Sequence, residues 1–279
     1  MKRSIHAIER PFGTLHVEVT GAADAGGGPA LIFAHGLGGN HMSWFQQVAH
    51  FAPMRTCVTF SHRGFLPSSP IPGGPDAADY AGDLAAIVAG LGIGAHHVVA
   101  QSMGGWTTVE YALSGSGGGR LRGIVLAATT GTLDAQRLPE ADRSAIAAWD
   151  AASGPIRARM RAEGVHPAAG LRMAAEQPAA HLLYQHINDI NRHLDKEALR
   201  VKLGAARQRD PMDLARAPCP VMMIANAEDT VIPPPAMAGI ARLVPGVRFE
   251  TIERAAHSAY FERPDAFNAL VEDFLARHP

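Results

Sequence analysis

The chain has 279 residues, of which 47% are hydrophobic and 18% charged, and its formal net charge is −1. This length allows a substantial buried core, in one large domain or in one domain with an insertion. A net charge near zero argues against nucleic acid or an acidic membrane surface as a partner. The sequence contains no apolar run of about 18 residues, so we expect no membrane span. The two cysteines, Cys57 and Cys219, are expected to be free thiols rather than a disulfide.

Short apolar runs alternate with longer helical patterns. The first run, residues 14–19, alternates apolar and polar side chains, which is typical of an edge strand in a hairpin. Six later runs are almost continuously apolar, as in strands covered on both faces: 30–35, 56–61, 97–102, 123–128, 220–226 and 247–252. Helical patterns occupy 41–51, 76–92, 103–113, 234–243 and 264–277. This order predicts an α/β fold with a mostly parallel sheet and helices on both faces.

One stretch breaks the alternation, because residues 133–210 contain no convincing strand. Pro139, followed by acids at positions 140 and 142, is typical of a helix start. An apolar stripe at helical spacing follows at Leu183, Ile187, Ile190 and Leu194. We therefore expect a helical cap at 133–210, inserted after the sixth strand of a core domain formed by residues 1–132 and 211–279.

A serine stands at the sharpest corner of the pattern. In "AQSMGG", Ser102 ends an apolar run, a helical pattern follows, and Ala100 and Gly104 are both small. This spacing indicates a nucleophile elbow, a strained turn that exposes the serine hydroxyl at the carboxyl edge of a sheet. The backbone N–H of Met103 would then face a developing oxyanion at the start of the helix.

Glycines follow an earlier predicted strand in "HGLGG", residues 35–39. They let the backbone approach a ligand, with the N–H of Leu37 as a second oxyanion donor beside Gly36 and Gly38. A dinucleotide fingerprint is the alternative, but the third glycine of that motif is replaced by His41. The next strand-like run also ends without the acid that a ribose needs, so we reject a dinucleotide-binding oxidoreductase.

Two further candidates follow late strands. Asp229 lies in a loop after the run 220–226, and His257 lies after the last run. A buried aspartate that fixes the tautomer of a histidine, which in turn activates a serine, forms a catalytic triad. The chain order Ser102, Asp229, His257 is the order of hydrolases with a nucleophile elbow. Glu228 and Asp134 are the alternative acids.

These motifs together resemble the α/β-hydrolase superfamily, from about residue 14 to 277. The matching stretches are "HGLGG", "SHRGFLPSS", "AQSMGGW", "AEDTVIPP" and "AHSAYFERPDAFN". The resemblance implies an eight-stranded sheet with its second strand antiparallel and a helical cap over the active site. Ala100 and Asn226 depart from the usual pattern, since both stand where glycine is frequent; Ser61 replaces a frequent Asp, and Leu66-Pro67 a glycine-containing turn.

The resemblance implies a serine hydrolase that cleaves an ester or lactone of a small, largely apolar carboxylic substrate through an acyl-enzyme. The same triad would serve a hydrolase of carbon–carbon bonds in a dienoic ring-cleavage product, or a cofactor-free perhydrolase or haloperoxidase. The non-enzymatic alternative is a small-molecule signal receptor on the same fold. We expect a cytoplasmic protein, monomeric or homodimeric, that binds a small molecule but neither nucleic acid nor membrane.

The substrate pocket is harder to predict, because it depends on the cap. Candidate contacts besides Gly36, Gly38 and His41 are Trp44, Trp106, Trp149 and Tyr184. Neither a cofactor nor a metal is expected, since His181, His186 and His193 are spaced by five and seven residues and do not share one helical face.

Overall fold

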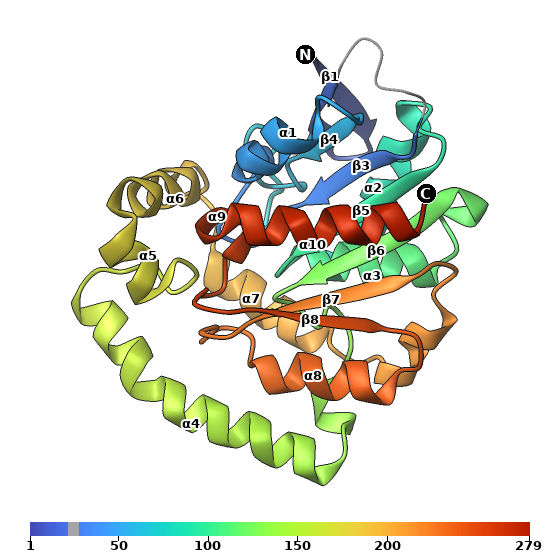
Figure 1. The fold of residues 1–279 in the computed structure, drawn as a ribbon. Helices are drawn as coiled ribbons and strands as arrows, with labels where there is room; N and C mark the ends of the chain where they lie inside the picture. The colour runs from blue at the N-terminus through green and yellow to red at the C-terminus, as the bar shows by residue number, and fades with distance from the viewer. Residues whose placement is uncertain (22–27) are drawn as a thin grey trace.

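One twisted sheet organises the molecule (Figure 1). The computed structural model describes residues 1–21 and 28–279, and its sheet has the strand order β1-β2-β4-β3-β5-β6-β7-β8. Strand β2 is antiparallel to both β1 and β4, and every other neighbouring pair is parallel. This confirms the predicted α/β-hydrolase fold with a mostly parallel sheet. The strands are β1 (Lys2–Arg10), β2 (Gly13–Gly21), β3 (Ala30–Ala34), β4 (Cys57–Phe60), β5 (His96–Gln101), β6 (Leu121–Ala127), β7 (Val221–Asn226) and β8 (Arg248–Ile252).

Helices cover both faces of the sheet. On one face lie α2 (Tyr80–Gly90), α3 (Gly104–Leu113) and α8 (Pro234–Leu243). On the other lie α1 (Phe45–Phe51) and α10 (Pro264–Arg277), with the short α9 (Ala259–Glu262) before α10. Short 3₁₀ turns complete the core: η1 (His41–Trp44), η2 (Ala77–Asp79), η3 (Gly118–Arg120), η4 (Ala135–Arg137) and η5 (Pro211–Arg216).

The alternating directions of side chains on β3 build both halves of the core. Ile32 packs into the cluster under α2, α3 and α8, whereas Leu31 and Phe33 pack into the cluster under α1 and α10. All three side chains are fully buried. Burying each such side chain contributes about 1.5–3 kcal/mol, which explains why strands buried on both faces have continuously apolar sequences.

The sheet has the eight strands and the antiparallel second strand that the resemblance implies, but one prediction at its edge was wrong. The apolar runs did not locate strand β1, because most of its side chains are exposed and its sequence contains no apolar run. Its presence moves β2, predicted over residues 14–19 as an edge strand, to a position between β1 and β4. The hairpin itself does form, with Lys2 opposite Gly21 and Arg10 opposite Gly13. Both cysteines are free, as expected.

Four helices lie between β6 and β7: α4 (Glu140–Ala162), α5 (Gly170–Glu176), α6 (Pro178–Ile190) and α7 (Lys196–Ala205). In Figure 1, α4 runs along the outside of the molecule, and only Ser153 and Met160 of this long helix are buried. Helix α6 ends at Ile190, so the predicted stripe reaches Leu194 only after the helix has ended. The division into a core and a cap at 133–210 remains a prediction.

A buried asparagine ties these helices to the core. Asn191 accepts a hydrogen bond from the backbone N–H of Leu66 at 2.7 Å and donates one to the carbonyl of Gly39 at 3.2 Å. The segment after α6 is therefore fixed beside the loop that follows β3.

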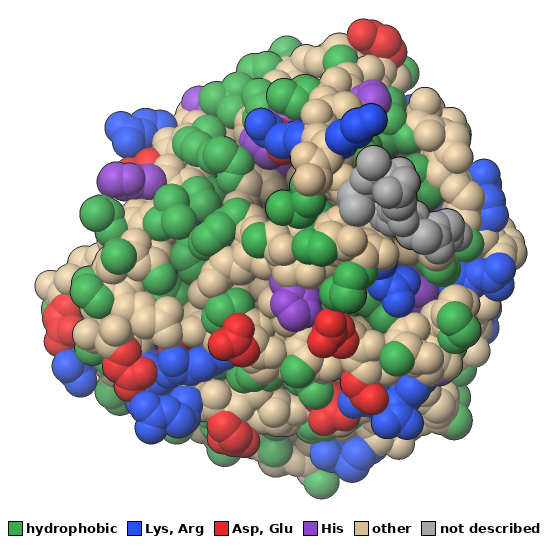
Figure 2. All heavy atoms as spheres, turned by 45° about the horizontal axis from the view of Figure 1, so that its top comes forward, with side chains coloured by type: hydrophobic (Ala, Val, Ile, Leu, Met, Phe, Trp, Pro, Cys, Tyr) green, Lys and Arg blue, Asp and Glu red, His purple; other side chains and the backbone are tan. Residues whose placement is uncertain are grey.

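Acidic and basic side chains are interspersed on the face of the molecule that Figure 2 shows. Among the described helices, none is both long and apolar enough to cross a bilayer.

Candidate active site

Ser102 occupies the strained corner between β5 and α3. Its φ is 50°, a left-handed conformation that non-glycine residues adopt infrequently. The turn is held on both sides, because Ser102 donates its N–H to the carbonyl of Ala127 at 3.1 Å and accepts from the N–H of Gly105 at 2.8 Å. These bonds offset the strain and fix the serine at the carboxyl edge of the sheet.

Close packing explains the small residues around Ser102. A Cβ atom on Gly104 would lie 2.2 Å from the carbonyl oxygen of Ala34, so no larger residue fits there. A Cβ on Gly36 would lie 2.2 Å from Gln101 Oε1 and 3.1 Å from Ser102 Cβ. Helix α3 and the loop after β3 can approach the serine only because both positions are glycine.

Asp229 and His257 form the bond that the sequence predicts. His257 Nδ1 lies 2.7 Å from Asp229 Oδ2, and both side chains are buried. The other carboxylate oxygen, Oδ1, accepts from the N–H groups of Val231 at 2.7 Å and Ile232 at 2.9 Å. Because a carboxylate only accepts, the imidazole proton must lie on Nδ1, which leaves Nε2 free to take a proton.

Two amide side chains, whose roles the sequence did not reveal, position the segment of His257. Gln101 Nε2 donates to the carbonyl of His257 at 3.1 Å, and Asn226 Nδ2 donates to the carbonyls of Ala256 at 2.7 Å and His257 at 3.1 Å. Asn226 ends β7, and its φ is not positive. The asparagine, which stands where glycine is frequent, therefore serves here to bond the loop of His257.

A pair of buried, neutral histidines supports the loop after β3. His35 Nε2 accepts from the backbone N–H of His62 at 3.0 Å, so its proton lies on Nδ1, which donates to the carbonyl of Gly36 at 2.8 Å. His62 Nε2 lies 2.8 Å from Thr107 Oγ1 on α3. Burial lowers the pKa of His35 to about 3, and that of His62 also falls well below its ordinary value. The pair therefore holds the loop to α3 without introducing charge.

A cavity of about 270 Å³ brings these elements together. Ser102 and His257 both line it, as do Leu37 and Met103, the two predicted oxyanion donors. The predicted contacts Gly38, Trp106 and Tyr184 also line it. Tyr184 comes from α6 and lies against the loop after β3, since a Cβ on Gly38 would be 2.9 Å from the Tyr184 hydroxyl.

Four predicted contacts do not line this cavity, which corrects the sequence interpretation. Trp44 has no exposed surface and packs against Phe33 and Tyr260, with ring centroids 5.0 and 4.4 Å away. Trp149 lines a separate cavity of about 560 Å³ beside α4, where its Nε1 donates to the carbonyl of Asp229 at 2.9 Å. Gly36 does not line the smaller cavity, although it packs against Ser102.

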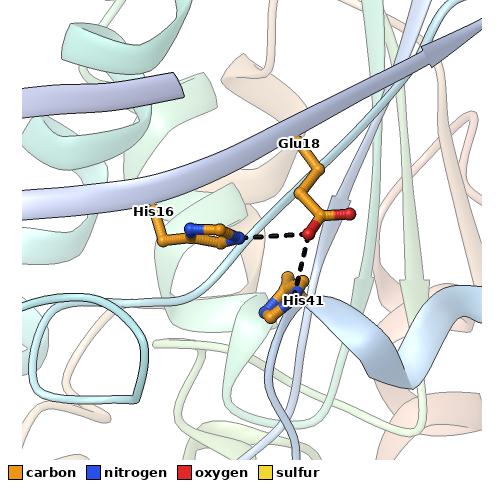
Figure 3. Close-up of side chains that lie close together, drawn as sticks. All are labelled: His16, Glu18 and His41. Carbon is orange, nitrogen blue, oxygen red and sulfur yellow. Dashed lines mark hydrogen bonds and ion pairs between the residues drawn. The ribbon is translucent and has the colours of Figure 1, made fainter. Parts of the chain in front are cut away.

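His41, the fourth, turns towards β2 (Figure 3). Its Nε2 lies 3.2 Å from Glu18 Oε1, and His16 Nε2 lies 3.1 Å from the same oxygen. Among the described residues, these three are the group whose ligand atoms lie close enough together to hold a metal ion. Arg3 already donates to both oxygens of Glu18, at 2.9 and 2.6 Å, so we interpret the group as a hydrogen-bonded ion network.

The alternative acids are engaged in other interactions. Glu228 pairs with Arg172 at 2.6 Å on the side of the larger cavity. Asp134 caps η4 by accepting from the N–H of Gln136 at 2.9 Å. Neither carboxylate is bonded to His257, whereas Asp229 is.

Comparison with known proteins identifies the family. A family model described as "Alpha/beta hydrolase family" matches residues 31–270. The chain belongs to the alpha/beta hydrolase family. It is 29% identical to 3-oxoadipate enol-lactonase 2 of Acinetobacter baylyi, covering 89% of each chain. It is 26% identical to the dihydrolipoyllysine-residue acetyltransferase component of the acetoin cleaving system of Cupriavidus necator, covering 93% of this chain and 67% of that one.

A solved structure extends the comparison to the fold. A thermophilic esterase from Thermogutta terrifontis superposes with a TM-score of 0.72 at 23% identity, over the whole of both chains. The protein is therefore an enzyme of the alpha/beta hydrolase family, and it shares the fold of this solved structure.

Proposed function

We propose that the protein is a serine hydrolase that cleaves an ester or lactone of a small carboxylic substrate through an acyl-enzyme. In this mechanism His257 Nε2 takes the proton of Ser102 as its Oγ attacks the carbonyl carbon. Asp229 keeps the proton of His257 on Nδ1 and stabilises the imidazolium that forms. The imidazolium gives its proton to the departing alcohol oxygen as the scissile C–O bond breaks, which leaves the acyl-enzyme. A water molecule, activated by the same histidine, then attacks the acyl carbon, and the acid is released as the bond to Ser102 Oγ breaks.

The observation that carries this proposal is the 2.7 Å bond between His257 Nδ1 and Asp229 Oδ2 at a cavity that Ser102 also lines. The bond leaves Nε2 of the buried His257 as an acceptor, and His257 lines the same cavity as Ser102. The left-handed φ of Ser102 supports its assignment as the nucleophile, because strain of this kind concentrates at functional sites.

The backbone N–H groups of Leu37 and Met103 are the proposed oxyanion hole. Met103 precedes α3, so the positive end of that helix lies behind its N–H. Leu37 belongs to the loop that His35 fixes through its bond to the carbonyl of Gly36. A rigid pair of donors stabilises the oxyanion without reorganising during the reaction.

We further propose that residues 133–210 act as a cap. Tyr184 and Asn188 of α6 line the cavity that Ser102 also lines, and α7 contributes a further part of its wall. The cap would then set which substrates enter, while the strand ends supply the chemistry.

The test is hydrolysis of p-nitrophenyl esters of increasing acyl length by the wild-type protein and by Ser102→Ala. Turnover that disappears in the variant supports the proposal, and the preferred acyl length measures the cavity. Turnover that persists in Ser102→Ala at the wild-type rate refutes it. If the wild type turns over no ester, lactones and dienoic carbon–carbon substrates are tested with the same pair.

A further inference from the structure

The cavity beside Ser102 has a strongly asymmetric charge. Lys196, Arg200 and Arg207 line it, and among the described residues no aspartate or glutamate does. The sequence interpretation expected a largely apolar pocket, and it missed these cations because their convergence depends on how α7 and the residues after it fold back over the sheet. Arg200 is exposed and already pairs with Glu197. Arg207 and Lys196 differ from Arg200 in the partners that their charged groups have.

Arg207 is a half-buried cation that forms no ion pair in the described part of the chain. Its guanidinium carbon lies 4.6 Å from the centroid of the Trp106 ring, in a cation–π contact. Its Nε is buried and, within residues 1–21 and 28–279, has no hydrogen-bond partner. Leaving a buried charged donor unsatisfied is costly, so such a group in a cavity wall indicates a ligand that would satisfy it.

Lys196 presents a second cation to the same cavity. Its Nζ donates to the carbonyl of Asn188 at 2.8 Å and to Asn188 Oδ1 at 2.7 Å, and both partners are neutral. Nearby His166 adds no competing charge, because burial lowers the pKa of His166 to about 4. The cavity wall therefore offers two cations to a ligand and no counter-ion of its own.

We propose that the substrate carries a free carboxylate in addition to its scissile bond, and that Arg207 and Lys196 bind this carboxylate. A guanidinium and an ammonium are the groups that recognise a carboxylate through charge-assisted hydrogen bonds. With a volume of about 270 Å³, the cavity limits the substrate to a small organic acid. This inference rests on the hydrolase function proposed above, and its test separates the two.

The test compares two esters that differ in whether a second carboxylate is free. One is the p-nitrophenyl monoester of glutaric acid, whose second carboxylate is free, and the other is the same compound with that carboxylate capped as a methyl ester. We expect the wild type to prefer the free acid in kcat/KM. Arg207→Met should reduce kcat/KM for the free acid about 10- to 100-fold, the loss of one charge-assisted hydrogen bond, and leave the capped ester nearly unchanged. Ser102→Ala supplies the rate of spontaneous hydrolysis.

Matched variants separate charge from packing. Arg207→Lys should recover part of the preference, and Lys196→Met should reduce it. Lys202→Met is the control. Lys202 lies on α7, as Lys196 does, but it donates to the carbonyl of Pro75 outside the cavity. Equal use of both esters by the wild type, or an equal loss for both esters in Arg207→Met, overturns the inference.

A binding measurement distinguishes the failure of this inference from the failure of the hydrolase proposal. Glutarate is titrated calorimetrically into the Ser102→Ala protein with and without Arg207→Met. Binding that weakens about 10- to 100-fold without Arg207 supports the carboxylate site even if no ester is hydrolysed. Ester hydrolysis by the wild type without any glutarate binding leaves the hydrolase proposal standing and overturns the carboxylate site.

Discussion

The two walls of the smaller cavity contrast in how their polar groups are satisfied. On the sheet side, Asp229 accepts three hydrogen bonds, and the carbonyl of His257 accepts two. On the α7 side, Arg207 Nε has no partner among the described residues, and Lys196 has only neutral ones. The carboxylate and the carbonyl that hold His257 in one geometry each accept several hydrogen bonds, whereas the cations proposed to bind a ligand retain unused donors.

Burial acts on both walls but has different consequences. It lowers the pKa of His35 to about 3, so that histidine stays neutral and serves only to hold the loop after β3. It lowers the pKa of Lys196 to about 8, which leaves most of this side chain charged at neutral pH. His35 thus positions its loop without adding charge, whereas Lys196 retains charge for recognition.

The largest expected effect lies on the sheet side. Ser102→Ala should lower kcat on the order of 10⁶-fold, as in comparable triads, because no other group supplies the nucleophile. Steady-state kinetics with the preferred ester measures it. If Ser102→Ala kept activity within tenfold of the wild type, the contrast between the two cavity walls would not describe catalysis.

Asp229→Asn should lower kcat by about 10⁴-fold with little change in the fold. An amide can still accept from the N–H groups of Val231 and Ile232, but its NH₂ cannot accept the proton of His257 Nδ1, so the wrong tautomer is favoured. The matched control is Glu228→Gln, which changes the neighbouring acid that pairs with Arg172. A larger loss in Glu228→Gln than in Asp229→Asn would reverse the assignment of the acid.

The close packing around Ser102 can be tested through its effect on the free energy of unfolding. Gly104→Ala should destabilise the protein by about 1–3 kcal/mol, because its Cβ meets the carbonyl oxygen of Ala34 at 2.2 Å. Gly154→Ala in α4 is the control, since its Cβ meets nothing within 4 Å and should stabilise by about 0.5–1 kcal/mol. Urea denaturation measures both. A neutral Gly104→Ala would show that the elbow is less tightly packed than the structure indicates.

The smallest expected effect is a pH dependence on the α7 side. Lys196 is cationic below its pKa of about 8, so the preference for the free-acid ester should be full near pH 6.5 and fall as pH rises towards 9.5. Asp189 raises this pKa and Arg200 lowers it, while Arg207 stays charged throughout the window.

The ratio of kcat/KM for the free-acid and capped esters is the measurement, because titration of the shared base cancels in it. Lys196→Met should give a flat ratio. A ratio that rises with pH in the wild type would contradict the assigned role of Lys196.

Sequence reasoning anticipated the sheet side better than the α7 side. Ser102, Asp229 and His257 each follow a strand whose apolar run is visible in the sequence, and parallel strands bring their carboxyl ends to one edge. Arg207 and Lys196 belong to helical and irregular segments whose placement depends on tertiary packing. Strand β1 was missed because an exposed edge strand needs no apolar run. The roles of Gln101 and Asn226 depend on carbonyl groups distant in sequence, which no local pattern reveals.

The most direct test of the central claim is covalent labelling of Ser102. A fluorophosphonate reacts with a serine only where a base and an oxyanion hole activate it, so intact-protein mass spectrometry should show one adduct per chain, located on Ser102 by peptide mapping. The Ser102→Ala protein should remain unlabelled, and the Asp229→Asn protein should react far more slowly. No adduct on the wild-type protein, or an adduct on another residue that persists in Ser102→Ala, would contradict the assignment of Ser102 as the activated nucleophile.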